Sequence, residues 1–307
     1  MASKRRSAEK FESPRGEGML RLRARSTGRF TDCFQYWLPV CTLVVALMAE
    51  GCAVRPRPAP VPPAPATLES ELLSSLDARR QAVTSLRGLA RVVYADPQEQ
   101  GTARQAIAVE TPDQFRLELF SPVGIALLTA CDGQTLAAYV PQEKTLYRGA
   151  ATPVNIARFI RIPLAARDIT SLLLGLPVLP THEEIGPAHA DPDTGGYQLT
   201  VGSAGHETHT LWFDRQRRLL TRWEAHAPDG ALLARVIFAD YRKVGGQYFP
   251  FEIVMSDTQT KQEASIYYER VELNPPLPDT LFTLRPIPGV QEVDVDAFAG
   301  EPSVTRF

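Results

Sequence analysis

Apolar and polar residues alternate along most of the chain after residue 86, which is the period of β-strands with one buried face. The pattern is clearest where Phe115, Leu117 and Leu119 alternate with Arg116 and Glu118. Similar runs lie between residues 86 and 148 and between residues 197 and 273, and turn residues separate them. We therefore expect a sheet of about eleven strands.

Helical spacing of apolar residues occurs in two places. Leucines recur on one face over residues 67–85, just before the first strand. Two shorter helices are expected over residues 153–160 and 165–174, on either side of a proline. Residues 179–196 are rich in proline and glycine and predict a loop, and residues 286–307 predict a loose tail.

An apolar hairpin tip interrupts the clearest strand pattern. Pro122 and Gly124 break the run, since proline cannot donate to a strand ladder and glycine permits a positive φ. A second strand then begins at Ile125, so the tip consists of Pro122, Val123, Gly124 and Ile125. Hairpin tips normally face water, so an apolar tip needs either cover or a partner. Two interpretations stay open: a neighbouring loop covers the tip, or the tip contacts another molecule.

The N-terminal residues predict a targeting signal. Arginines precede an apolar run over residues 37–48, which is too short to span a bilayer and fits a signal-peptide core. Cys52 follows Gly51 and resembles the lipidated cysteine of a bacterial lipobox. Residues 1–52 are thus predicted to be a leader and lipoprotein signal peptide, with an uncleaved anchor as the alternative. No Asp adjoins Cys52, which by resemblance to known lipoproteins favours lipid anchoring at the periplasmic face of the outer membrane.

A proline-rich tether follows the predicted lipidation site. Residues 55–65 contain six prolines among eleven residues, within a linker over residues 53–66. Such a segment favours an extended polyproline II conformation and would span roughly 30 Å at about 3.1 Å per residue. The tether would hold a folded domain away from the membrane.

Composition and charge exclude several classes of function. The chain is 44% hydrophobic and 22% charged with a net charge of -2, which is typical of an ordinary globular domain. No basic stripe lies outside the N-terminus, so nucleic acid is not an expected partner. Cys131 is the single cysteine after Cys52, which predicts a buried thiol and no disulfide framework.

Catalytic and metal-binding motifs are not expected. His206 and His209 lie three residues apart with Glu207 between them, but they lack the spacing of the helical zinc signature His-Glu-x-x-His. We therefore predict no metal, no cofactor and no enzymatic activity, and keep a hydrolase that uses these histidines as a third hypothesis.

Large apolar residues occupy both faces of many predicted strands. A curved sheet would use one such face for a core and a lined cavity. Burying each methylene of an acyl chain in that cavity would stabilise the complex by roughly 0.8 kcal/mol without polar chemistry. For any one of these residues, a plain core role is the alternative. The expected lining residues are Phe115, Leu117, Leu119, Leu127, Leu172, Leu173, Leu176, Trp212, Trp223, Phe238 and Phe251.

The run Phe115-Arg116-Leu117-Glu118-Leu119-Phe120-Ser121-Pro122-Val123-Gly124, the downstream Leu174-Gly175-Leu176-Pro177 and the lipobox resemble the LolA/LolB group of bacterial lipoprotein carriers. The likeness is to an outer-membrane LolB-like lipoprotein and covers most of residues 67–285. It implies an α+β fold, in which helices cover a strongly curved, unclosed antiparallel half-barrel.

The same resemblance implies a function. The family cavity holds lipoprotein acyl chains, and a loop with an exposed Leu helps insert cargo into the outer membrane; here Val123 takes that position. Expected partners are lipoprotein acyl chains or lipid, the outer membrane and a periplasmic LolA-like carrier. The alternative is a scaffold lipoprotein that binds a partner protein through the same sheet.

Overall fold

The computed structural model describes residues 67–179, 184–202 and 205–297. The predicted signal peptide, Cys52 and the tether lie outside these residues. The helices are α2 (Leu68–Ala82), α3 (Pro153–Ile160), α4 (Ala166–Leu173) and the 3-10 helix η1 (Asp279–Phe282). The strands are β1 (Ser85–Ala95), β2 (Gln100–Glu110), β3 (Gln114–Ser121), β4 (Gly124–Cys131), β5 (Thr135–Val140), β6 (Thr145–Ala150), β7 (Ile185–Ala190), β8 (Tyr197–Val201), β9 (Thr208–Phe213), β10 (Leu220–His226), β11 (Leu232–Val244), β12 (Gln247–Asp257), β13 (Gln262–Leu273) and β14 (Gln291–Asp294).

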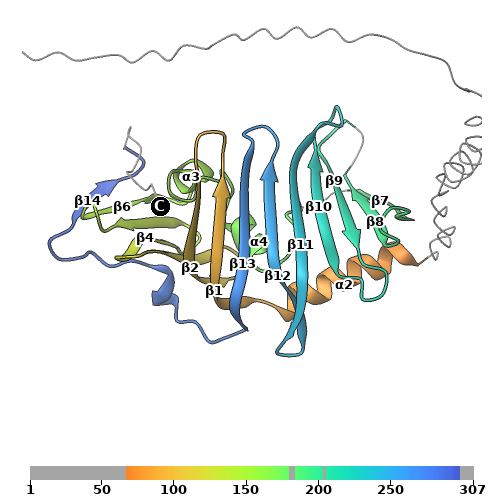
Figure 1. Cartoon of the computed structure of the whole chain (residues 1–307), viewed down its shortest axis with the longest axis horizontal. Coiled ribbons are helices and arrows are strands. Elements are labelled where there is room, and N and C mark those ends of the chain that lie inside the picture. Colours follow the sequence, from red (N-terminus) through yellow and green to blue (C-terminus); the bar gives the residue numbers. More distant parts are fainter. Residues whose placement is uncertain (1–66, 180–183, 203–204, 298–307) are drawn as a thin grey trace, which may run out of the picture. The chain divides into compact units, whose positions relative to one another are not determined.

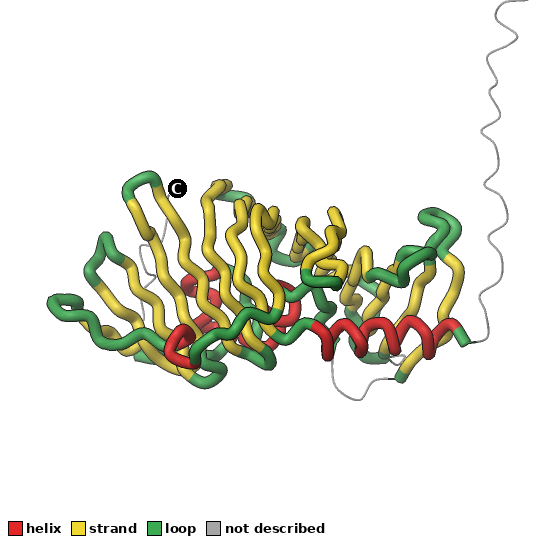
Figure 2. The backbone as a smooth tube through the Cα atoms, turned by 90° about the horizontal axis from the view of Figure 1, so that it is seen from below, coloured by secondary structure: helices red, strands yellow, loops and turns green. Residues whose placement is uncertain are grey.

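All strands of the described part belong to one curved sheet (Figures 1 and 2). Its order is β14-β6-β5-β4-β3-β2-β1-β13-β12-β11-β10-β9-β8-β7. Neighbouring strands are antiparallel, except that β14 runs parallel to β6. The two edge strands, β14 and β7, do not pair with each other, so the sheet is unclosed.

The sheet has fourteen strands where about eleven were expected. Both edge strands lie in segments predicted to lack regular structure: β7 within the expected loop and β14 within the expected tail. The strand β7 contains Gly186 and Pro187, and β14 has charged residues at two of its four positions, so neither has an alternating apolar pattern. Such sequences are typical of edge strands, where proline and charge discourage further pairing. The described part of the tail is therefore attached to the sheet rather than loose.

The sheet has fewer helices over it than the sequence predicted. The described residues contain three α-helices and one 3-10 turn, so the expectation that helices cover the sheet is only partly correct. The first helix ends earlier than predicted, at Ala82, because Val83 is already extended (φ −126°, ψ 97°). The helix α3 matches its predicted range, and the Thr152 Oγ1 caps it by accepting a hydrogen bond from the Asn155 N–H at 3.2 Å.

The core lies between one face of the sheet and the three α-helices. Buried leucines of α2 and α4 pack with alternate residues of the strands, among them Phe115 and Ile253. Arg79 joins these layers, because its guanidinium donates to the carbonyl oxygens of Tyr248 on β12 and Leu174 after α4. Bulges after Leu89 and Leu119 interrupt the ladder register, and bulges increase local bending. The resulting curvature shapes the site described next.

Candidate functional site

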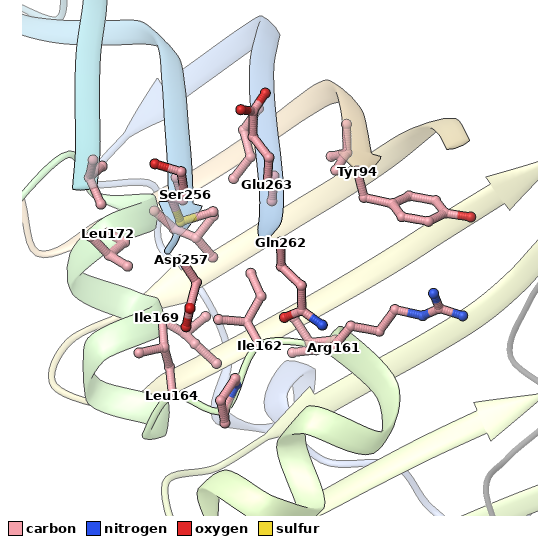
Figure 3. Close-up of a pocket in the computed structure, with 18 of the residues that line it drawn as sticks. Tyr94, Arg161, Ile162, Leu164, Ile169, Leu172, Ser256, Asp257, Gln262 and Glu263 are labelled. Carbon is pink, nitrogen blue, oxygen red and sulfur yellow. The ribbon is translucent and has the colours of Figure 1, made fainter. Parts of the chain in front are cut away.

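A mostly apolar cavity of about 290 Å³ lies inside the curve of the sheet (Figure 3). This volume is just below the range usual for small-molecule sites, roughly 300–1,000 Å³. Its wall is formed by the neighbouring strands β4-β3-β2-β1-β13-β12-β11-β10. Because those strands border one cavity, the curvature of the sheet creates the site.

The segment from the end of α3 to the end of α4 forms the opposite wall. Residues 159–164 and the side chains of Ile169, Leu172 and Leu173 line this side. Figure 3 shows Ile162 and Leu164 on this segment facing the ends of β12 and β13. The segment leaves α3 sharply because Arg161 adopts the left-handed conformation (φ 65°) at the helix C-terminus.

An ion pair at the rim joins the two walls. The Arg161 guanidinium lies 3.1 Å from a Glu99 carboxylate oxygen and 3.4 Å from an Asp96 carboxylate oxygen. It also lies 5.4 Å from the ring centre of Tyr94, whose pKa is raised by burial and then by the nearby Glu99 carboxylate. Because Arg161 is partly exposed, each pair contributes only about 0–1 kcal/mol. The contact positions residues 159–164 against the turn between β1 and β2.

Six predicted lining residues border this cavity: Leu117, Leu119, Leu127, Leu172, Leu173 and Trp223. They come from β3, β4, α4 and β10, which are distant in sequence. These six residues therefore border a common cavity, and their role in holding acyl chains stays a prediction.

The other five predicted lining residues do not border the cavity. Phe115, Leu176 and Phe238 are buried in the packed core, because neighbouring side chains already fill the space around them. Trp212 alternates with the inward Leu211, so it lies on the other face, where the Arg222 guanidinium is 3.7 Å from its ring centre. The ring of Phe251 lies against the guanidinium of Arg242, 4.3 Å away.

Several lining residues were not predicted from sequence. The largest group is the connection between α3 and α4, which includes Ile162 and Leu164. Thr129 on β4, Met255 on β12 and Ile266 on β13 also line the wall. The apolar residues of the connection were a usable signal, since a surface loop seldom carries several of them.

The hairpin of β3 and β4 extends from the cavity wall to the apolar tip. Leu119 pairs with Leu127 beside the cavity, and the chain then reverses at Pro122 and Val123. Val123 is 91% exposed and Ile125 is 37% exposed, so no described residue covers the tip. The interpretation in which a neighbouring loop covers it is therefore wrong for the described part of the chain.

The tip has a defined turn. The Ser121 hydroxyl donates to the Gly124 carbonyl oxygen at 3.0 Å and accepts from the Val123 N–H at 3.4 Å. Gly124 has φ 126°, which other residues rarely adopt. The turn thus presents Val123 to solvent on a fixed backbone.

His206, His209 and Cys131 differ in burial. His206 is exposed, whereas His209 is buried and stacks on the ring of Trp223 at 5.8 Å. Among the described residues, no group of three or more His, Cys, Asp or Glu could hold a metal ion. Burial raises the pKa of the Cys131 thiol to about 11, so this cysteine is poorly reactive near neutral pH.

The helices of the described part are short, and the longest, α2, has 15 residues. None of them is both long enough and apolar enough to cross a bilayer.

Comparison with known proteins relates this fold to solved structures. A family model described as an uncharacterized protein matches residues 200–288, which is less than half of the chain. No curated protein matches.

Two solved bacterial structures resemble this chain at low sequence identity. A putative outer membrane lipoprotein-sorting protein domain from Vibrio parahaemolyticus is 15% identical with a TM-score of 0.50, and the match covers 69% of this chain and 94% of that domain. A LolA superfamily protein from Nitrosomonas europaea is 17% identical with a TM-score of 0.49 and coverage of 70% and 97%. At 15% identity, the likeness to the Vibrio domain concerns the fold alone.

Proposed function

We propose that this protein is a LolB-like carrier that accepts the acyl chains of lipoproteins or lipids and passes them into the outer membrane. The observation that carries the proposal is the apolar cavity between the curved sheet and the α3–α4 segment. Its leucines and isoleucines supply the surface that an acyl chain needs, and polar groups such as Arg161 and Glu263 lie at the rim (Figure 3). The scaffold alternative does not require such a cavity.

Acyl chains gain enough free energy in such a site to be held reversibly. Each buried methylene contributes about 0.8 kcal/mol, so ten of them contribute about 8 kcal/mol. Association costs an estimated 4–15 kcal/mol, so burial of ten methylenes outweighs this cost only near the lower end of the range, and the net affinity is modest at most. A modest affinity suits a carrier, because cargo must leave for the bilayer without any bond being made or broken.

The proposed location follows from the N-terminal sequence. Lipidation of Cys52 would anchor the chain at the periplasmic face of the outer membrane, and the proline-rich tether would let the cavity reach cargo in the periplasm. A periplasmic LolA-like carrier is the proposed donor. The exposed hairpin tip would contact the acceptor bilayer during release.

Filling the cavity tests the proposal. Ala264 on β13 lines the cavity and is not fully buried, so Ala264→Trp would occupy the space that cargo needs. Ala239 on β11 lies two residues after the exposed Ile237 and therefore on the same face of the sheet, away from the cavity. Ala239→Trp is thus the matched control. The measurement is native mass spectrometry of the full chain extracted in mild detergent and incubated with an acylated lipopeptide.

The expected result is a bound lipopeptide in the wild type and in Ala239→Trp, and its loss in Ala264→Trp. Equal binding by the two tryptophan variants would show that the cavity is not the cargo site. A wild type that binds no acylated molecule would reject the carrier proposal itself.

A further inference from the structure

A layer of large side chains closes one end of the cavity. On β3, β11, β12 and β13, the lining residue nearest the core has a buried residue two positions away on the same strand face, and that residue does not line the cavity. These buried residues, which we call the floor, are Phe115, Phe238, Ile253 and Tyr268. Each of them is at most 4% exposed and belongs to the packed core. The cavity therefore ends where this layer begins.

The mouth of the cavity lies at the other end. Asp96 follows β1, Asp257 ends β12 and Gln262 begins β13, and all three residues line the cavity. Because β1 and β12 both pair antiparallel with β13, these residues lie at one edge of the sheet. Arg161, which forms an ion pair with Asp96, lies at the same edge (Figure 3). One end of the cavity is thus polar, and the other end is closed by large buried side chains.

The distance from mouth to floor matches about ten methylenes. The lining residues span four residue steps on β1, from Val92 to Asp96, and four steps on β13, from Gln262 to Ile266. Four steps correspond to about 13 Å at about 3.3 Å per residue. An extended acyl chain advances about 1.25 Å per methylene, because its C–C bonds of about 1.5 Å follow a zigzag. A chain that reaches the floor therefore buries about ten methylenes.

The volume of the cavity leads to a similar length. A cavity of about 150 Å³ in another protein holds one benzene, which gives about 25 Å³ per carbon atom. At that ratio, the cavity of about 290 Å³ has room for about twelve carbons. Two chains side by side over the same depth would need about 500 Å³. The volume and the depth therefore agree for one chain and not for two.

We infer that the cavity takes a single acyl chain to a depth of about ten to twelve carbons, and that its cargo is a molecule with one acyl chain. This inference rests on the proposed function and names the substrate class of the same cavity: a monoacylated lipid or peptide whose polar group stays at the mouth. A second chain on the same molecule, or the end of a longer chain, would remain in water.

A chain-length series tests the depth. The full chain is kept in digitonin, whose steroid tail is not an acyl chain, with an equimolar mixture of octanoyl, decanoyl, dodecanoyl, tetradecanoyl and hexadecanoyl lysophosphatidylcholine. Native mass spectrometry measures the occupancy by each lipid and the number of lipids per protein. Micelle and cavity compete for every chain, so a methylene that is buried in both leaves the occupancy unchanged. Each methylene left outside the cavity should lower the occupancy about fourfold, the equivalent of about 0.8 kcal/mol.

The wild type should bind one lipid per protein, with similar occupancy from octanoyl to dodecanoyl. Occupancy should fall about fifteenfold at tetradecanoyl, which adds two methylenes, and again at hexadecanoyl. Didecanoyl phosphatidylcholine, which has two chains, should not be detected in competition with decanoyl lysophosphatidylcholine. A decanoylated peptide is compared with the same lysolipid, and occupancy by either one supports the inference and identifies the source of the chain.

Floor variants test what sets the limit. Phe238→Ala removes a large floor side chain and should extend the accepted length by at least two carbons, to tetradecanoyl. Ile253→Ala removes fewer atoms and is the second floor variant, with the same expected direction. Phe282→Ala is the matched control, because Phe282 is 1% exposed but lies on η1, outside the core. The Arg116 side chain, which alternates with the inward Phe115, donates to the Leu281 carbonyl oxygen at 3.2 Å, so η1 lies on the other face of β3. Phe282→Ala should keep the wild-type limit.

The outcomes separate the inference from the proposed function. Equal occupancy by hexadecanoyl and decanoyl lysophosphatidylcholine, two lipids on one protein, or binding of the diacyl lipid would overturn the inference and leave an acyl-chain carrier. A limit that stays at the wild-type length in floor variants that still bind decanoyl lysophosphatidylcholine would overturn it as well. A wild type that binds neither the lysolipids nor the acylated peptide would overturn the proposed function and the inference together.

Discussion

The exposed hairpin tip makes the proposed release step testable at one side chain. Val123 is 91% exposed at a turn that Ser121 and Gly124 hold in place, so its substitution has no packed neighbours to disturb. Substitutions at such surface positions usually change the free energy of unfolding by less than about 0.5 kcal/mol. An effect on cargo transfer would therefore report contact with the membrane rather than loss of the fold.

The magnitude follows from the apolar surface that the tip would bury in a bilayer. Val123→Leu adds one methylene, which stabilises the inserted tip by about 0.8 kcal/mol and should speed transfer about fourfold. Val123→Ala removes two such groups, or about 1.6 kcal/mol, and should slow transfer about fifteenfold. Val123→Glu places a charge at the tip and should slow transfer at least as much as alanine does.

The assay loads the full chain with a pyrene-labelled acyl ester and follows pyrene transfer into phospholipid vesicles. Val154 on α3 is 67% exposed and lies outside the cavity and the tip, so Val154→Glu controls for a general effect of surface charge. Wild-type rates in Val123→Ala and Val123→Glu, with unchanged ligand affinity, would refute the reasoning. An equal loss in Val154→Glu would refute it as well.

Three further predictions concern stability and reactivity. Tyr268 donates its hydroxyl to the Leu173 carbonyl oxygen at 3.0 Å, so Tyr268→Phe should lower the free energy of unfolding by about 0.5–1.5 kcal/mol in denaturant titrations, and an unchanged midpoint would contradict this. Burial raises the pKa of Tyr147 to about 12 and raises the pKa values of Tyr241 and Tyr268 as well. Tyrosines in the unfolded chain ionise from about pH 10, so the contribution of these groups to the free energy of unfolding should be complete below that pH and fall above it. A free energy of unfolding that does not change between about pH 9.5 and 11.5 would contradict this prediction. Alkylation of Cys131, mapped by mass spectrometry, should be negligible in the folded chain at pH 8 and complete in denaturant; rapid labelling of the folded chain would contradict its burial.

Local sequence patterns accounted for most of the central strands and for two features of the site. The helix α3 has the bounds that its apolar residues and the proline that follows it predicted, because those signals act over a few residues. The apolar tip and Leu117, Leu119 and Leu127 were likewise predicted, since they belong to one hairpin. Local patterns could not reveal β7 and β14, because neither has an alternating apolar sequence. These two segments form strands by pairing with β8 and β6, respectively.

By itself, the sequence determined which residues are apolar and which share a strand face. Only the tertiary structure decided which of those residues line a cavity and which fill the core. Trp223 borders the cavity while Trp212 lies on the other face, although both belong to apolar strand segments. Alternation assigns residues to two faces but does not say which face is inside. That choice depends on contacts between distant segments, such as Arg161 with Glu99 and α4 with β3. Because of these contacts, the α3–α4 segment encloses a cavity over one part of the sheet, while packed side chains fill the space over another part.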